Sequence, residues 1–134
     1  MTHSDTIKTV YEAFGRGDVA GILAHVTNDV DWDNSAVSSA SCPWNGNFSG
    51  KTRLPEFFKA VAESLDITVF EPGTFVDSGS HVAVELRIES TVRKTGKPIK
   101  NTGMHLWTFD ASGKISRYRH FNDTGAELAA SKVG

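Results

Sequence analysis

The sequence predicts an α+β domain, with a strongly bent, mostly antiparallel sheet packed on three N-terminal helices and a short helix at the C-terminal end. Up to about residue 64 apolar residues recur with helical spacing, and from Leu65 onward they alternate as they do in strands. Helices that precede a run of strands are typical of this class. Each predicted strand is apolar on one face only, so we expect the helices to cover that face.

The first helix is predicted to be capped by Ser4 or Asp5 and to end at residues 15–17, which include two glycines. Its apolar stripe consists of Ile7, Val10, Tyr11 and Phe14. Asp18 is placed to cap a second helix, which we expect to end at Asn28-Asp29.

A short alternating strand is expected next, over Val30–Asn34. Residues 35–49 are rich in Ser, Asn, Gly and Pro and predict a long loop, packed down over a cavity as a lid. The aromatic residues that favour this packing are Trp44 and Phe48. A third helix is predicted at about Thr52–Ser64, where Pro55 falls in the first turn and its missing N–H costs little.

The remaining sheet is predicted to consist of the strands Asp66–Val76, His81–Arg93, Pro98–Phe109 and Lys114–Asn122. Pro72-Gly73 interrupts the first of them. Thr124 with Glu127 has the spacing of a capping box, which predicts a terminal helix ending near Ser131.

The composition indicates a single domain over residues 1–134, long enough to bury a core without disulfides. A net charge of −2 without a basic run excludes the electrostatic signature of nucleic-acid binding and of binding to anionic membranes. Cys42 is the only cysteine, so no intrachain disulfide can form. The sequence shows no signal peptide and no apolar run long enough to span a membrane, so we expect a cytoplasmic protein.

The last hairpin is predicted to carry the functional site. Side chains alternate across a strand, so His105 and Trp107 share one face of its first arm. Tyr118, His120 and Asn122 share one face of its second arm. If both faces lie on the same side of the sheet, the convergence of imidazole, phenol, indole and amide groups is typical of a small-molecule pocket.

The chain as a whole resembles the SnoaL-like, ketosteroid-isomerase-like branch of the nuclear transport factor 2-like superfamily. The matching segments are residues 10–18 with Ile22, Phe48–Lys51 before Phe57-Phe58, Arg93–Pro98, and Gly113–Thr124. The resemblance implies a cone-like α+β barrel with a deep pocket. It also implies a homodimer paired through the outer sheet face, which would account for Glu85, Arg87 and Glu89.

The catalytic residues of ketosteroid isomerase do not carry over well. Without gaps, its helix-one tyrosine falls on Val10 and its oxyanion-binding aspartate on His105. Its general base falls on Asn34, beside Asp33, and a supporting tyrosine falls on Phe58. An amide takes up no proton at neutral pH, so steroid isomerisation by that route is not expected.

The predicted catalytic residues are His105, His120, Asp33 and Asp123. Alternatives stay open for three of them: His105 as a buried, hydrogen-bonded core residue, Asp33 as a surface carboxylate and Asp123 as the cap of the last helix. The predicted substrate-binding residues are Asn34, Tyr118, Asn122, Trp32, Trp107 and Phe58. No metal or other cofactor is expected, because the histidines lack ligand-like spacing.

Two functions follow from this sequence. The first is a cofactor-free acid–base enzyme of the isomerase, cyclase or hydratase type, acting on a small, apolar, oxygenated substrate. The second is a non-catalytic ligand-binding or dimerisation module, which the amide at position 34 favours.

Overall fold

The structure is a computed structural model that describes residues 2–36 and 41–133. Three helices and two strands come first: α1 (His3–Gly15), α2 (Val19–Leu23), β1 (Val26–Asn34), β2 (Gly46–Asn47) and α3 (Leu54–Ser64). The remaining elements are β3 (Leu65–Asp77), β4 (His81–Val92), β5 (Pro98–Phe109), β6 (Ile115–Phe121) and α4 (Thr124–Ser131). The predicted α+β class is confirmed.

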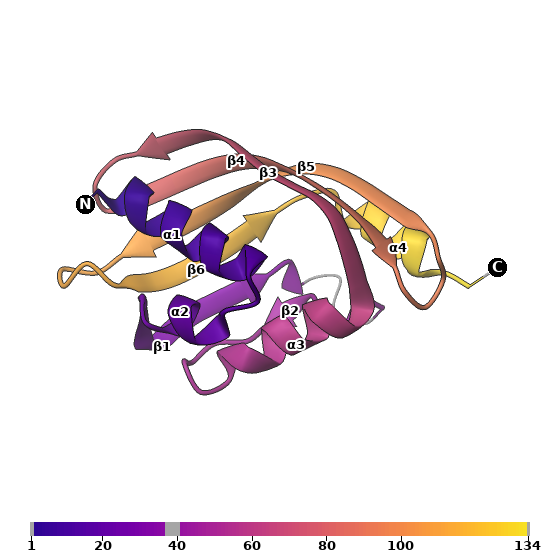
Figure 1. Ribbon diagram of the computed structural model, residues 1–134, viewed down its shortest axis with the longest axis horizontal. Helices are drawn as coiled ribbons and strands as arrows, with labels where there is room; N and C mark the ends of the chain where they lie inside the picture. Colours follow the sequence, from indigo (N-terminus) through magenta and orange to yellow (C-terminus); the bar gives the residue numbers. More distant parts are fainter. Residues whose placement is uncertain (1, 37–40, 134) are drawn as a thin grey trace.

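The strands form one six-stranded sheet in the order β2-β1-β6-β5-β4-β3. Every neighbouring pair is antiparallel except β1 and β6, which run parallel. The sheet is bent and does not close, and α1, α2 and α3 lie along its concave side (Figure 1). The helices thus cover one face of the sheet, as the alternating strands predict.

The bend of the sheet has two local causes. The predicted interruption at Pro72-Gly73 is a shift of register between Pro72 and Phe75 within β3. This edge strand tolerates proline because nothing pairs with its outer side. In β5, a Cβ on Gly103 would lie 2.5 Å from the carbonyl oxygen of Phe121. Only glycine therefore allows the close approach of β5 to β6 at this point.

The helix starts are partly as predicted. Asp18 caps α2 by accepting from the Gly21 backbone N–H at 2.9 Å. The prediction that Ser4 or Asp5 caps α1 is wrong, because Thr2 is the cap. Thr2 and Asp5 form a capping box in which each side chain accepts from the other residue's backbone N–H.

The predicted second helix is too long. It ends at Leu23, and β1 begins at Val26 where a helix was expected to continue to Asn28-Asp29. Val26 is buried and pairs with Ile115 of β6. This long-range pairing buries apolar surface that a solvent-exposed helical turn would leave in water, so tertiary contacts override the local pattern.

The segment over residues 35–49 is packed down where it is described, as its aromatic residues predict. Trp44 and Asn45 are buried, and β2 pairs with the end of β1. Residues 37–40, which belong to the predicted lid, lie outside the described residues.

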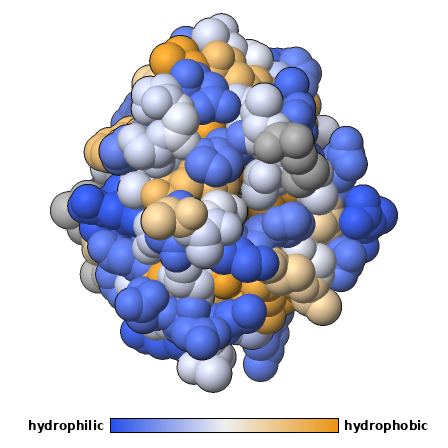
Figure 2. Space-filling model, turned by 90° about the vertical axis from the view of Figure 1, so that its left-hand side faces the viewer, coloured by the Kyte–Doolittle hydropathy of each residue, from blue (hydrophilic) through white to orange (hydrophobic). Residues whose placement is uncertain are grey.

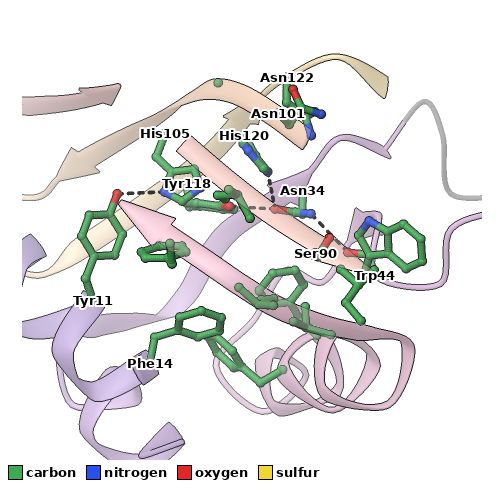
Figure 3. Close-up of a pocket in the computed structure, with 18 of the residues that line it drawn as sticks. Tyr11, Phe14, Asn34, Trp44, Ser90, Asn101, His105, Tyr118, His120 and Asn122 are labelled. Atoms are coloured by element: carbon green, nitrogen blue, oxygen red, sulfur yellow. Dashed lines mark hydrogen bonds between the residues drawn. The ribbon is translucent and has the colours of Figure 1, made fainter. Parts of the chain in front are cut away.

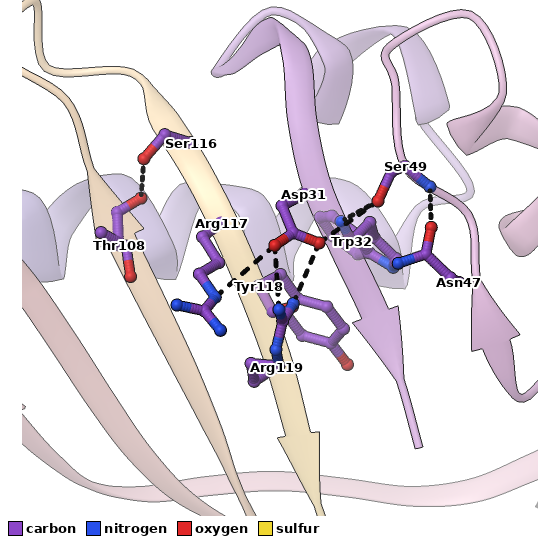
Figure 4. Close-up of polar contacts among 9 residues, drawn as sticks. All are labelled: Asp31, Trp32, Asn47, Ser49, Thr108, Ser116, Arg117, Tyr118 and Arg119. Atoms are coloured by element: carbon purple, nitrogen blue, oxygen red, sulfur yellow. Dashed lines mark hydrogen bonds and ion pairs between the residues drawn. The ribbon is translucent and has the colours of Figure 1, made fainter. Parts of the chain in front are cut away.

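The convex face of the sheet is polar. Arg119 forms a two-point ion pair with Asp31, with N–O distances of 2.9 and 3.2 Å, and Arg117 approaches the same carboxylate (Figure 4). The end of the molecule that carries the β3–β4 and β5–β6 turns is mostly hydrophilic, with apolar residues in separate patches (Figure 2). Among the described residues, no helix has the length and apolar character needed to cross a membrane.

Candidate functional site

A cavity of about 100 Å³ lies between the concave face of the sheet and helices α1 and α3 (Figure 3). Most of its wall is aromatic or aliphatic. The polar residues in the wall are Tyr11, Asn34, Ser90, Asn101, His105, Tyr118, His120, Asn122 and Glu127. None of the described residues that line it is a lysine or arginine. The cavity therefore has no fixed positive charge for an anionic ligand.

The β5–β6 register brings the predicted residues together. His105 pairs directly with His120, and Trp107 pairs with Tyr118. The two imidazole rings lie edge to face with centroids 4.6 Å apart. The predicted convergence of both strand faces on one side of the sheet is confirmed.

A first hydrogen-bonded group is centred on Tyr11. Its hydroxyl lies 2.8 Å from Nδ1 of His105 and accepts from the indole N–H of Trp107 at 3.2 Å. Tyr11 was not predicted as a site residue, since its position in the apolar stripe of α1 indicated core. Val10, on which the ungapped alignment placed the family's phenol, also lines the cavity, but the phenol that contacts His105 is that of the next residue, Tyr11.

A second group is centred on Asn34. Its Oδ1 accepts from the Tyr118 hydroxyl at 2.7 Å and lies 3.2 Å from Nδ1 of His120. Its Nδ2 donates to the backbone oxygen of Trp44 at 3.2 Å and to Oδ1 of Asn45 at 2.9 Å. All the polar atoms of this amide are thus engaged, which fixes its orientation.

The third group surrounds Glu127, a residue that the sequence analysis assigned to a capping box. That assignment is wrong: Asp123 caps α4, and Glu127 is buried in the cavity wall. Its carboxylate accepts from Trp44 Nε1 at 2.6 Å, Asn45 Nδ2 at 3.0 Å and Asn122 Nδ2 at 3.2 Å. The signal in the sequence was weak: Glu127 precedes Ala130 by three residues, so the two lie on the same helix face. Ala130 is buried in the structure.

Burial keeps the histidines and tyrosines of the cavity wall neutral. It lowers the pKa of His120 to about 4. Burial and the neighbouring His120 hold the pKa of His105 well below its usual value. The pKa of Tyr118 is raised well above its usual range, and that of Tyr11 is also raised, in both cases mainly by burial. At neutral pH these residues are two imidazoles and two phenols.

The hydrogen bonds also assign the imidazole protons. Because Oδ1 of Asn34 only accepts, Nδ1 of His120 carries the proton and its Nε2 is a proton acceptor. The Tyr11 hydroxyl accepts from Trp107, and among the described residues Nδ1 of His105 is the only acceptor that its own O–H contacts, so we assign the Tyr11 proton to this contact. His105 then carries its proton on Nε2. The two facing histidines are therefore assigned opposite roles, one as acceptor and one as donor.

The remaining predicted residues divide into two sets. Those that line the cavity are Trp32, Phe58, Trp107 and Asn122. The indole N–H of buried Trp32 has no hydrogen-bond partner among the described residues. Asp33 and Asp123 do not line the cavity, since Asp33 accepts from the Ala36 backbone N–H and Asp123 from that of Ala126. Asp33 is thus placed as a surface carboxylate and Asp123 as the cap of α4, the alternatives given for them above.

No group of three or more His, Cys, Asp or Glu side chains that could hold a metal ion occurs within residues 2–36 and 41–133.

The bent sheet, the three covering helices and the cavity between them define an NTF2-like α+β protein. The sequence matches the SnoaL-like domain family over residues 7–118, and the chain belongs to that family. No curated protein matches it significantly.

Solved structures agree with this assignment. An NTF2-like protein of unknown function from Burkholderia pseudomallei superposes with a TM-score of 0.87 at 23% identity, covering 98% of both chains. One from Burkholderia thailandensis gives 0.85 at 26% identity, again over 98% of both chains. TerC, crystallised with polyporic acid, gives 0.83 at 25% identity, over 96% of this chain and 97% of its own. Neighbours below 20% identity include polyketide cyclase-like and ketosteroid isomerase-like proteins, which show the fold alone.

Proposed function

We propose that the protein is a cofactor-free acid–base enzyme of the isomerase, cyclase or hydratase type, acting on a small, apolar, oxygenated substrate. One observation carries the proposal. In a cavity whose wall is mostly aromatic or aliphatic, the donor His105, backed by Tyr11, faces the acceptor His120, backed by Asn34. A donor and an acceptor on one wall are the two groups needed to enolise a carbonyl compound.

The proposed chemistry moves one proton. The substrate oxygen accepts from Nε2–H of His105, while Nε2 of His120 removes a proton from the carbon next to the carbonyl. The electron pair of the broken C–H bond passes to the oxygen as an enolate, and His120 becomes an imidazolium whose Nδ1–H stays bonded to Asn34. Return of the proton to a different carbon completes an isomerisation. Neutral His105 polarises the oxygen without protonating it.

The lining selects against anionic substrates. A cavity without lysine or arginine among its described lining residues, and with Glu127 in its wall, does not compensate a carboxylate or phosphate. The substrate class supported by the cavity is a neutral ketone, enone, lactone or quinone-like molecule. The ligand of TerC supports the view that this fold holds oxygenated small molecules.

Deuterium exchange tests the reaction without knowledge of the natural substrate. The protein is incubated in heavy water with acetophenone, cyclic enones and lactones, and loss of the protons next to the carbonyl is followed by NMR. We expect His120→Gln and His105→Gln to slow exchange about a hundredfold or more. His81→Gln, which replaces an exposed histidine of β4, is the matched control. Unchanged exchange in folded His120→Gln would contradict the proposed base.

The second candidate function is a binding module without catalysis. The amide at Asn34, fully engaged in hydrogen bonds, favours it because this position holds the base in the isomerase. This candidate predicts ligand binding that quenches tryptophan fluorescence but no exchange above the buffer rate in the same samples.

We also propose that the outer sheet face pairs two copies of the chain. The predicted charged residues Arg87 and Glu89 pair with each other, and Arg87 also pairs with Glu71 at 2.7 Å. Exposed apolar Met104 and Phe121 lie opposite each other on neighbouring strands of this face. Sedimentation should give a dimer that Phe121→Glu dissociates. Ala111→Glu in the β5–β6 turn should leave it intact, and a monomeric wild-type protein would contradict the proposal.

A further inference from the structure

We infer that the substrate is elongated, with an oxygenated head in the inner cavity and an apolar tail in a groove between α1, α3 and β3. The inference rests on the proposed function for the identity of the head, but the site of the tail is argued from the groove itself. The binding site thus accepts a long molecule with one polar end.

The inner cavity is too small for a large substrate. An apolar protein cavity of roughly 150 Å³ holds a molecule the size of benzene. At about 100 Å³, the space beside His105 and His120 is smaller than that and has room for part of a ring or a short oxygenated fragment. Any larger substrate must extend out of it.

The groove provides that extension. It has a volume of about 1010 Å³ and is lined by residues of α1, α2, α3 and β3. Side chains that line the groove but not the inner cavity include Val19, Pro55, Val69, Pro72 and Phe75. Its charged lining residues are Lys8, Glu12 and Lys59, and Lys8 lies over the Phe75 ring at 5.1 Å from its centroid. The surface offered to a ligand is thus mainly apolar.

The two spaces adjoin each other, since several side chains line both of them. The shared residues include Tyr11, Phe14, Phe58, Val61, Ile67 and Phe70. Tyr11 stands at this boundary, with its hydroxyl on His105 and its ring edge-on to Phe70 at 5.3 Å. In the inferred path, a molecule whose oxygen reaches His105 passes Tyr11 and continues along Phe70 into the groove. The position of the groove directly beside the cavity favours a ligand tail over a protein partner as the occupant.

A homologous series of phenyl n-alkyl ketones, from acetophenone to decanophenone, tests the inference. All three tryptophans of the chain line the inner cavity, so quenching of their fluorescence reports the arrival of the aromatic head. We expect the dissociation constant to fall about fourfold for each added methylene that enters the groove. A dissociation constant that does not depend on chain length would overturn the inference.

Blocking the groove locates the tail. Ala62 is exposed, lines the groove and does not line the inner cavity, so Ala62→Phe should fill the path of the tail. We expect this variant to lose most of the length dependence while it binds acetophenone like the wild type. Thr68→Phe, on the opposite wall, is a second variant, and Glu63→Phe, exposed on α3 outside both spaces, is the control.

The outcomes are distinguishable from failure of the proposed function. Length dependence retained in both groove variants would place the tail elsewhere and overturn the inference. So would a change of sedimentation in Ala62→Phe, because it would mark the groove as a protein interface. Deuterium exchange of acetophenone, by contrast, depends on His120 and needs no tail. Its absence would contradict the proposed chemistry while leaving the length dependence intact.

Discussion

The two faces of the β5–β6 hairpin carry polar residues in opposite ways. On the concave face His105 and His120 are neutral and bonded to neutral partners, Tyr11 and Asn34. On the convex face Arg119 is ion-paired with a carboxylate of β1. Residues on the two faces alternate along the same strands, so only the side of the sheet separates them.

The difference lies in how each face treats charge. Toward water, the hydrogen bond and charge of Arg119 lower the pKa of Asp31 and keep both groups ionised. Toward the cavity, burial lowers the pKa of His120 and opposes ionisation. Groups on the convex face are held by paired charges that water screens, and groups on the concave face by neutral hydrogen bonds that water does not reach.

The largest expected effect is at Glu127, whose carboxylate is buried in the cavity wall and does not face water. Glu127→Ala leaves the donors of Trp44, Asn45 and Asn122 without their acceptor. We expect the free energy of unfolding to fall by about 4 kcal/mol, measured by urea denaturation. Glu127→Gln, which retains one acceptor, should cost less. Equal losses in both variants would show that charge rather than hydrogen bonding matters at this position.

The two faces should lose stability in different pH windows. The folded pKa of His120, about 4, lies below the unfolded value of 6.5, so the unfolded chain binds the proton first. Stability should therefore fall as pH drops from about 6.5 to 4, by roughly 3 kcal/mol at most from this residue.

The lowered pKa of Asp31 makes its contribution disappear only below its unfolded value of 3.8. Unfolding curves measured at intervals between pH 7 and 3 separate the two windows. His120→Gln should reduce the loss of stability in the upper window, to which His105 also contributes, and leave the lower window unchanged. An unchanged upper window would refute the assignment to the histidine.

A smaller effect is expected for Tyr11→Phe. The change removes the hydroxyl and leaves Nδ1 of His105 and the indole N–H of Trp107 without a partner, with little change of volume. We expect a loss of about 2 kcal/mol in thermal or urea unfolding. A loss below about 0.5 kcal/mol would mean that water replaces the hydroxyl. It would contradict the view that water does not reach the hydrogen bonds of the concave face.

The smallest effect is expected on the convex face. Asp31→Asn removes the partner of Arg119 and Arg117, yet the Asp31 side chain is 44% exposed. We expect a loss below about 1 kcal/mol, which 1 M salt should reduce further. A loss as large as that of Tyr11→Phe would contradict the proposed difference between the two faces, because a solvated ion pair would then stabilise the fold as much as a buried hydrogen-bond network does.

Local patterns in the sequence were sufficient for strands β3 to β6 and for half of the site. Alternation along β5 and β6 predicted that His105, Trp107, Tyr118 and His120 share one face, because side-chain direction in a strand follows from the backbone alone. The same alternation predicted the outward charges of β4.

The residues of other elements that contact this hairpin could not be read from local patterns and became known from the tertiary structure. Tyr11 and Glu127 lie on helices at opposite ends of the chain, and their roles depend on packing angles that no local spacing encodes. The start of β1 at Val26 was likewise decided by pairing with β6, a contact between residues distant in the sequence. The sequence determined the direction in which each strand side chain points. Tertiary packing determined its partners, because the hydrogen bonds around the cavity join separate elements.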